Sequence, residues 1–284
     1  MKWSLLFLLL LVAGCDIAPI SPIVQSVPSS NTLLLGTFNI QVFGTTKASN
    51  AEVMKVLVDT VVQYDVIAIQ EFRDVSNKTI PAFLNALNKA KNVYAEVHSP
   101  PLGRSTSKEN YAFFYDKTKT QVLGSYTYED ANDVFEREPF IAYFKTGSFD
   151  YVLINVHTKP DDATNEINEL AIVALNAQRH FREQDIIILG DFNADGAYFD
   201  EEGFTSLKTQ DYTWIVPNDY DTTVATSSNT YDRIVLTKSS MEDYAEQVSV
   251  IHFDTTSNLS LEQAKKVSDH YPLKAVFKTD GDTD

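Results

Sequence analysis

Short apolar runs alternate with longer amphipathic stretches along most of the chain. Runs that are mostly apolar and rich in β-branched or aromatic side chains predict strands at 33–40, 66–69, 111–115, 121–126, 140–144, 151–156, 186–189 and 234–236. Apolar residues at helical spacing predict three helices, at about 50–64, 81–89 and 165–181. This mixture predicts a mixed α/β (α+β) fold with two β-sheets.

The most informative run is Ile186 to Leu189 with the residues that follow it, G-D-F-N-A-D at 190–195. Four apolar residues, three of them β-branched, predict a strand that is buried on both faces. Gly190 then lets the backbone turn, and Asp191 and Asn193 come directly after it. The carboxylate could bind a hard cation, and the amide could hold a phosphate or a nucleophile. The alternative is an ordinary strand followed by a turn that aspartate stabilises.

A second segment follows the same plan. Residues 63–71 and 183–191 each contain a helix end, an aspartate, four apolar residues, one further residue and a carboxylate. If two such halves pack sheet against sheet, Glu71 and Asp191 come to one edge of a central sandwich. Chance similarity over so short a stretch is the alternative.

Further polar residues stand beside the predicted strands. They are Asn39, Glu71, Glu109, His157, Tyr231-Asp232-Arg233 and Ser268-Asp269-His270. Taken singly, a histidine near a strand end is more often structural than catalytic, and an aspartate there is usually a turn former. Taken together with Asp191 and Asn193, this set of two histidines, several carboxylates and two asparagines indicates a metal-assisted site for a phosphoester.

The first residues indicate export. Lys2 precedes an apolar core at 5–12 that is too short to cross a bilayer, and small residues follow. The segment V-A-G-C at 12–15 is similar to a bacterial lipobox, which implies that Cys15 is lipidated. We therefore expect a signal peptide at 1–14, a tether at 15–31 and a lipid-anchored protein of a bacterial cell envelope. A plain secretory signal, and so a secreted protein, is the alternative.

Composition limits both the partners and the means of stabilisation. Cys15 is the single cysteine in 284 residues, so no disulfide can form within the chain. The formal charge of -16 becomes -17 once Lys2 leaves with the signal, so a nucleic acid would have to be met by a local basic patch. No composition break divides the remainder, which predicts one domain at 32–279, an acidic tail at 280–284 and a monomer.

Several short motifs occur along the chain in the same order as in one known family. They are F-N-I at 38–40, I-Q-E-F-R-D at 69–74, P-L-G-R at 101–104, K-E at 108–109, R-E-P at 137–139, H-x-x-P at 157–160, G-D-F-N-A-D at 190–195, D-T-T at 221–223, Y-D-R-I-V at 231–235 and S-D-H-Y-P at 268–272. The set resembles deoxyribonuclease I within the endonuclease/exonuclease/phosphatase superfamily, from about residue 33 to residue 277. P-L-G-R, Arg73 and Arg137 point to that branch. The resemblance implies a four-layered sandwich, with helices outside two central mixed sheets.

The resemblance also implies a metal site. Glu71, with Asn39 and Asp269 nearby, would hold Mg²⁺ (or Mn²⁺) that polarises the scissile phosphate. Asp191 and Asn193 would position the phosphate, the water or a second ion.

Two carboxylate–histidine pairs are implied for proton transfer. His157 would pair with Glu109, and His270 with Asp232, so that each carboxylate fixes an imidazole tautomer and raises its basicity. His270 is assigned as the base that activates water, and His157 as the general acid or the metal-proximal partner. The two pairs are so alike that the opposite assignment stays open.

Substrate contacts follow from the same resemblance. Arg73 would enter the minor groove of DNA, mainly double-stranded, Arg137 would reach a phosphate, and Arg104 and Tyr231 would also contact the substrate. Without the resemblance, solvated surface charge would be the preferred interpretation of the arginines. Ser107 replaces a stacking tyrosine of the family, and that loss should weaken or redirect DNA binding without abolishing hydrolysis.

Calcium would compensate for the absent disulfides of the family. Gly196 and Asn229 occupy one pair of its cysteine positions. The implied structural Ca²⁺ ligands are Asp130, Asp133, the Phe135 carbonyl and Glu138 for one site, and Asp221 and Thr223 for part of another. Ala225 stands where a further ligand of the second site is expected. As ordinary loops, these acidic segments would simply be solvated.

Three functions remain open from the sequence. The first is a divalent-metal-dependent endonuclease that cuts DNA with little sequence preference and leaves 5′-phosphate and 3′-hydroxyl ends. The second is a phosphodiesterase or phosphatase of the same fold that acts on a lipid or a small phosphoester. The third is a surface binding module without activity, against which the complete set of site residues argues. Arg73 and P-L-G-R favour the first.

Overall fold

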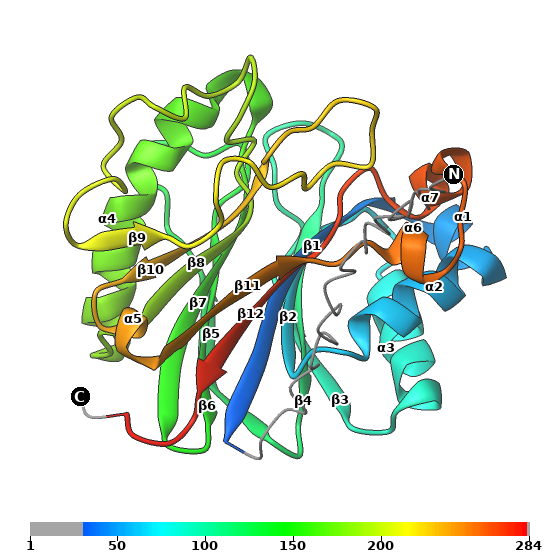
Figure 1. Ribbon diagram of the computed structural model, residues 1–284, viewed down its shortest axis with the longest axis horizontal. Coiled ribbons are helices and arrows are strands. Elements are labelled where there is room, and N and C mark those ends of the chain that lie inside the picture. The colour runs from blue at the N-terminus through cyan, green and yellow to red at the C-terminus, as the bar shows by residue number, and fades with distance from the viewer. Residues whose placement is uncertain (1–30, 283–284) are drawn as a thin grey trace, which may run out of the picture.

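The computed structural model describes residues 31–282, and within them two six-stranded sheets pack face to face with helices on both outer sides (Figure 1). The four-layered sandwich expected from the sequence is therefore confirmed. The predicted signal peptide at 1–14, the lipidation site Cys15 and the tether up to residue 30 lie outside the described residues. Of the helices within 31–282, none combines the length and the apolar character that crossing a bilayer requires.

The first sheet has the strand order β11-β12-β1-β2-β4-β3. Its strands are β1 (Thr32–Phe43), β2 (Val66–Phe72), β3 (Tyr94–His98), β4 (Asn110–Asp116), β11 (Tyr244–Val250) and β12 (Leu273–Lys278). β1 and β2 are parallel, and the other neighbouring strands described in this sheet are antiparallel. The carboxyl ends of β1 and β2, which carry Asn39 and Glu71, therefore meet at one edge.

The second sheet repeats this arrangement with the order β5-β6-β7-β8-β10-β9. Its strands are β5 (Thr120–Thr127), β6 (Phe140–Thr146), β7 (Phe149–His157), β8 (Ile186–Asp191), β9 (Tyr212–Trp214) and β10 (Asp232–Thr237). β7 and β8 are parallel, in a register that places His157 opposite Asp191. The similarity of 63–71 to 183–191 thus corresponds to two strands, β2 and β8, that end at the same edge of the sandwich.

Helices form the two outer layers. Beside the first sheet lie α1 (Thr45–Ala48), α2 (Ala51–Val61), α3 (Thr79–Ala90), α6 (Phe253–Thr256) and α7 (Leu261–Val267). The second sheet is covered by α4 (Ala163–Phe181), which follows the 3-10 turn η1 (Pro160–Asp162), and α5 (Ser240–Asp243) connects β10 to β11. Asn50 caps the N-terminus of α2, because its side chain accepts the backbone N–H groups of Glu52 and Val53.

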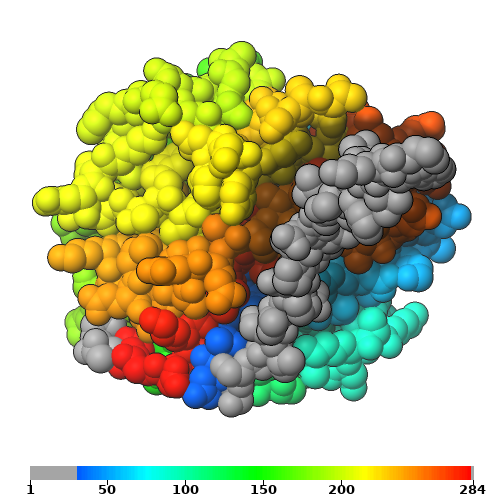
Figure 2. Space-filling view, viewed as in Figure 1, coloured from blue at the N-terminus to red at the C-terminus, as the bar shows by residue number. Residues whose placement is uncertain are grey.

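All of the predicted strands and helices are present, with ends within three residues of the prediction. The prediction did not include β3, β9, β11, β12 or the short helices. β12 was missed although it carries a strand signal, because its buried residues Leu273, Ala275 and Phe277 alternate with less buried ones. In the space-filling view the yellow connection between β8 and β10 covers the upper left of the face, above the orange α5 and β11 (Figure 2).

Apolar side chains fill three spaces between the four layers. Between the sheets, the rings of Phe113 and Phe144 lie 5.4 Å apart. Between the first sheet and its helices, Phe83 and Phe114 lie 5.2 Å apart, and α4 contributes Leu170 to the third space. Fully burying one large apolar side chain contributes about 1.5–3 kcal/mol, so core burial can stabilise the fold without disulfides.

A buried polar bridge joins the sheets directly beneath the edge that carries Asn39, Glu71 and His157. The Gln70 amide donates to Thr37 Oγ1 at 3.0 Å and to Asn155 Oδ1 at 2.7 Å, and the Asn155 amide donates to the Ile69 carbonyl at 3.3 Å. The three polar side chains of the bridge have no exposed surface. Because such groups are costly to bury unpaired, the bridge restrains how the two sheets align next to the site.

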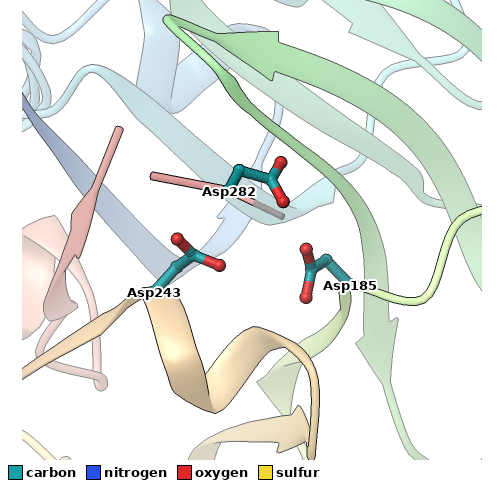
Figure 3. Close-up of side chains that lie close together, drawn as sticks. All are labelled: Asp185, Asp243 and Asp282. Carbon is teal, nitrogen blue, oxygen red and sulfur yellow. The ribbon is translucent and has the colours of Figure 1, made fainter. Parts of the chain in front are cut away.

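Three aspartates gather at the other end of β8. Asp185, Asp243 and Asp282 have carboxylate oxygens within 4.8 Å of one another (Figure 3). Asp282 also accepts the backbone N–H of Asp150 at 3.1 Å, and the Gly281 N–H donates to Ser148 Oγ at 3.2 Å. The first residues of the predicted acidic tail therefore contact the turn between β6 and β7.

Gly190 is required by the close approach of β7 to β8. Its φ is 146°, and a Cβ at this position would lie 2.0 Å from the carbonyl oxygen of Val156. Two backbones can come this close only where a side chain is absent. The glycine of the G-D-F-N motif thus fixes the distance between the strands that carry His157 and Asp191.

We expect Gly190→Ala to lower the free energy of unfolding by more than about 3 kcal/mol, because the strands must separate to admit the methyl group. Denaturant unfolding measures the change. Gly103→Ala is the control, since Gly103 also has a positive φ, 116°, but a Cβ added there would have its nearest neighbours at 3.7 Å. Equal losses in the two variants would show that backbone strain, rather than the contact with Val156, is responsible.

Candidate active site

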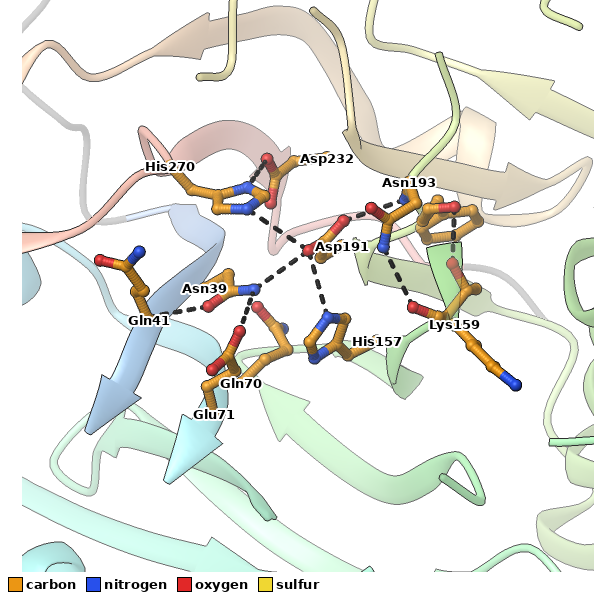
Figure 4. A network of polar contacts seen from close by, with 12 residues as sticks. Asn39, Gln41, Gln70, Glu71, His157, Lys159, Asp191, Asn193, Asp232 and His270 are labelled. Carbon is orange, nitrogen blue, oxygen red and sulfur yellow. Dashed lines mark hydrogen bonds and ion pairs between the residues drawn. The ribbon is translucent and has the colours of Figure 1, made fainter. Parts of the chain in front are cut away.

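Asp191 lies at the centre of the site (Figure 4). Its Oδ2 atom accepts the Asn39 amide at 3.0 Å and lies 3.4 Å from His157 Nε2 and 3.5 Å from His270 Nε2. Its Oδ1 atom accepts the backbone N–H of Asn193 at 2.9 Å. The two imidazoles thus face one buried carboxylate oxygen.

Each imidazole is held from behind by a second carboxylate. Glu109 Oε1 lies 2.9 Å from His157 Nδ1, and Asp232 Oδ2 lies 2.8 Å from His270 Nδ1. The structure therefore brings together both pairs expected from the sequence. Because the carboxylates engage Nδ1, Nε2 of each ring is the atom that can exchange a proton toward Asp191.

Burial and charge act in opposite directions on these groups. Burial disfavours the charged imidazole, but Asp232 and Asp191 outweigh it and raise the pKa of His270 well above 6.5. Burial also disfavours the charged form of His157, but the nearby Glu109 outweighs burial, so the pKa of His157 is raised as well. Burial favours a neutral Asp191, yet the two histidines lower its pKa. The centre of the site therefore holds an ionised Asp191 carboxylate between two imidazoles whose basicity is raised.

Glu71 reaches the site through an irregular backbone. Its φ is 70°, and Gln41 and Val42 on β1 also have positive φ values, 44° and 47°, where the pairing of β1 with β2 shifts register. Glu71 Oε1 accepts the Asn39 amide at 3.2 Å, and Oε2 accepts the Val42 N–H at 2.8 Å. Positive φ is costly for residues other than glycine, so tertiary contacts must hold this bulge.

Lys47 provides such a contact. Its ammonium group donates to the carbonyls of Ile40 and Gln41 at 2.8 and 2.6 Å. Burial lowers the pKa of Lys47 to about 8, against the opposing effects of Asp269 and Glu71. The lysine thus lies near both of the carboxylates that were expected to bind a metal.

The residues expected to bind Mg²⁺ suit a hard cation. Glu71 offers carboxylate oxygens, and among the described atoms the buried Oδ1 of Asp269 has no hydrogen-bond partner. Asp269 Oδ1 lies 3.9 Å from His270 Nε2. The Asn39 oxygen already accepts the Gln41 N–H at 2.9 Å, so Asn39 presents its amide nitrogen to Glu71 and Asp191. Asn39 therefore orients these carboxylates, and a metal bond to it would need the second lone pair of its oxygen.

The three arginines occupy different environments. Arg73 pairs with Glu71 at 3.1 Å and with Glu109 at 3.3 Å. Arg137 lies behind the Glu109 pair, 3.3 Å from its carboxylate, and donates to the His157 carbonyl at 3.1 Å. Arg104 is exposed and pairs at 2.9 Å with Asp133. In this structure Arg73 lies at the edge of the site, whereas Arg137 supports the dyad.

Both loops expected to bind Ca²⁺ are held by their own hydrogen bonds. Asp130 accepts the Phe135 N–H at 2.7 Å, and Asp221 Oδ1 accepts the Thr223 N–H at 3.0 Å. Within residues 31–282, the carboxylates of Asp130, Asp133 and Glu138 are not gathered within 4.8 Å of one another. The ligand positions are therefore close in sequence, but their side chains do not converge in this structure.

Other expected positions are adjacent as the resemblance implies. A Cβ on Gly196 would lie 3.2 Å from Asn229 Oδ1, so the positions of one family disulfide face each other. Ser107 Oγ lies 3.5 Å from a nitrogen of Arg73. The ring of Tyr231 lies 6.3 Å from that of His270, so this tyrosine stands beside the second dyad.

Glu166 is a supporting residue that the sequence analysis missed. Its side chain is 1% exposed and accepts the backbone N–H groups of Glu136 at 2.8 Å and of Lys159 at 3.1 Å. It therefore joins the loop that carries Arg137 to the one that follows His157. Burial raises its pKa to about 7, although the two N–H donors oppose this. The only sign of this role in the sequence was an acidic residue in the first turn of a helix, and acidic residues are common there on exposed helices as well.

Glu166 should make the stability of the protein depend on pH. Because its pKa is raised from 4.5 to about 7, the protonated carboxyl favours folding; this contribution is complete below pH 4.5 and is lost as the pH rises through about 7. We expect the free energy of unfolding of the wild type to fall relative to Glu166→Gln over that range, by up to about 3 kcal/mol. Denaturant unfolding at several pH values measures this, with Glu169→Gln on the same helix as control. A difference that does not change with pH would contradict the assignment.

Comparisons with known proteins agree on one family. The model of the Endonuclease/Exonuclease/phosphatase family matches residues 36–270. Deoxyribonuclease-1-like 1 of Homo sapiens is 38% identical over 250 residues, which cover 85% of this chain and 83% of that protein. Deoxyribonuclease-1 of Bos taurus is 36% identical over 260 residues, which cover 87% and 92%.

Solved structures show the same fold at lower identity. A crystal structure of humanized D. rerio TDP2 has a TM-score of 0.63 at 17% identity and covers 88% of this chain and 100% of that one. The human Nocturnin catalytic domain has a TM-score of 0.61 at 13% identity and covers 87% and 93%. At these identities the similarity concerns the fold alone.

Proposed function

This chain belongs to the deoxyribonuclease I-like branch of the endonuclease/exonuclease/phosphatase family, and we propose that it is an endonuclease that hydrolyses phosphodiester bonds of DNA. The observation that carries the proposal is the pair of buried carboxylate–histidine dyads that face one oxygen of Asp191. Two imidazoles at one position can remove a proton from water and supply one to a leaving group.

The two histidines would divide the proton transfers between them. His270 takes a proton from the attacking water at Nε2, while Asp232 at Nδ1 stabilises the imidazolium that forms. His157, held by Glu109, gives a proton to the 3′-oxygen as it leaves. Breaking the bond to this oxygen leaves a 5′-phosphate and a 3′-hydroxyl. Asp191, through Asn39 and Asn193, keeps both rings directed toward the phosphate.

The carboxylates at the edge of the site would hold a divalent ion. Glu71 and Asp269 would hold Mg²⁺ (or Mn²⁺), with Asn39 orienting them, and the ion when bound would offset negative charge on the scissile phosphate. Arg73 then remains beside Glu109 at the edge of the site, where its guanidinium can enter a minor groove. Contacts to phosphates and sugars carry no sequence information directly, and base edges in the minor groove distinguish little more than A·T from G·C, so we expect cleavage of double-stranded DNA with little sequence preference.

We also propose the setting in which this enzyme works. Lipid attachment at Cys15 would anchor a monomer at a bacterial cell envelope, while a plain secretory signal would release it. Structural Ca²⁺ at the 130–138 loop, and at Asp221 and Thr223, would replace the stabilising effect of disulfides.

A phosphodiesterase or phosphatase that acts on a lipid or small phosphoester is the second candidate. The observation in its favour is the expected lipid anchor, which would keep the site near a membrane. The similarity to deoxyribonucleases, together with Arg73 at the edge of the site, favours DNA instead. Cleavage of plasmid DNA with Mg²⁺, and its loss with EDTA, compared with release of phosphate from phospholipid vesicles, decides between the two.

The dyads generate a prediction about catalysis. His157→Ala and His270→Ala should each reduce plasmid cleavage by roughly two to four orders of magnitude. On a diester with a 4-nitrophenolate leaving group, which needs no acid, His157→Ala should lose much less than His270→Ala. His98→Ala is the control, because His98 also pairs with a carboxylate, Glu96 at 2.7 Å, but is exposed on β3. Activity within tenfold of wild type in both site variants would overturn the assignment.

The proposed calcium loop predicts an effect on stability. Ca²⁺ at about a hundred times its dissociation constant should add roughly 2.7 kcal/mol to the free energy of unfolding. Asp133→Ala should lose this response and keep Mg²⁺-dependent cleavage, whereas Arg104→Ala should retain it, because the guanidinium that competes for Asp133 is removed. The melting temperature after thorough chelation, with and without Ca²⁺, measures the effect. No change in the wild type would count against the site.

A further inference from the structure

The two sides of Asp191 differ in positive charge. On the His157 side, Arg73 and Arg137 both lie within 3.3 Å of Glu109. On the His270 side, the carboxylate of the dyad, Asp232, has no arginine or lysine partner among the described residues. A DNA strand that passes over Asp191 therefore meets arginines on the His157 side only. On the His270 side, its phosphates would need another positively charged group.

A pocket of about 380 Å³ opens beside His270. Its polar lining includes Ser227, Asn229 and Tyr231 from the connection that leads into β10, and Asp269 and Lys265 from the segment before β12. Lys265 is the single lysine or arginine of the lining. It lies in the last turn of α7, and its side chain is exposed.

The lining suits a phosphodiester group. Hydroxyl and amide groups can donate hydrogen bonds to phosphate oxygens, and an ammonium group supplies charge without demanding a fixed geometry. The one carboxylate of the lining, Asp269, is a proposed metal ligand. By contrast, a pocket near Tyr198 is lined by Asp195, Asp200, Glu201 and Glu202, and would repel a phosphate.

A DNA substrate needs a binding position for the phosphates next to the scissile one. Each nucleotide of a strand carries a phosphate, so a scissile phosphate between the dyads has charged neighbours on both sides. We propose that the pocket beside His270 binds the phosphodiester group next to the scissile one, and that Lys265 supplies its positive charge. This inference rests on the proposed endonuclease function.

Lys266 offers a matched control. It is also exposed and lies next to Lys265 on α7, but it pairs with Glu262 at 3.7 Å and does not line the pocket. Alanine at either position removes one positive charge from the same short helix. A difference between Lys265→Ala and Lys266→Ala therefore measures the position of the charge rather than the net charge of the protein.

The test measures kcat and KM on duplex DNA with Mg²⁺ over a series of NaCl concentrations. Lys265→Ala should raise KM roughly fivefold with kcat within twofold, and should reduce the slope of log kcat/KM against log salt by about 0.9, the value for one lost phosphate contact. Lys265→Arg should restore both, and Lys266→Ala should change neither. On bis(4-nitrophenyl) phosphate, which has no neighbouring phosphate, all variants should equal the wild type.

The outcomes separate this inference from the function on which it rests. Equal behaviour of Lys265→Ala and Lys266→Ala, with a wild type that cleaves DNA, would overturn the subsite alone. An equal loss by Lys265→Ala on DNA and on the small diester would also overturn it, because the lysine would then act on the reacting group. A wild type that cleaves no DNA would overturn the endonuclease function and this subsite with it.

Discussion

Burying several carboxylates side by side is the constraint on which the site depends. Glu71, Glu109, Asp191 and Asp232 are each at most 7% exposed. A buried charge without a partner costs several kcal/mol, so each needs a cation or a hydrogen-bond donor at close range. The Asn39 amide donates to Glu71 and Asp191. His157 and two arginines pair with Glu109, and His270 pairs with Asp232. Strands from both sheets end at this edge and together supply the partners of these groups.

Strained backbone and buried polar bridges also hold the groups of the site in position. The left-handed residues Gln41, Val42 and Glu71 interrupt the regular pairing of β1 with β2. The Glu71 carboxylate there accepts the amide of Asn39, which also donates to Asp191 of the second sheet. Lys47 holds this bulge, and the buried bridge from Gln70 beneath it aligns the sheets. Because interiors are close-packed, a small shift of one sheet cannot be absorbed locally and would separate donors from acceptors throughout the site.

The sequence predicted those parts whose signal is local. Apolar runs indicated β2, β7 and β8, and the motif resemblance paired the dyads in advance. Glu166 could not be predicted, because its partner Glu136 is 30 residues away and only burial distinguishes it from a surface glutamate. β12 was missed although the alternation of its buried and less buried residues is typical of a strand that is covered on one face. Arg137 was expected at a phosphate, and only the fold reveals its contacts with the dyad behind the site.

Each dyad joins the two sheets. Glu109 precedes β4 of the first sheet and its histidine ends β7 of the second, whereas His270 precedes β12 of the first and its carboxylate begins β10 of the second. Neither half of the sandwich alone therefore contains a complete acid–base pair. During synthesis the chain would stay harmless to nucleic acid until residue 270 has emerged and the halves have docked. Both acid–base pairs are thus properties of the assembled sandwich, and a chain whose sheets have not docked presents neither.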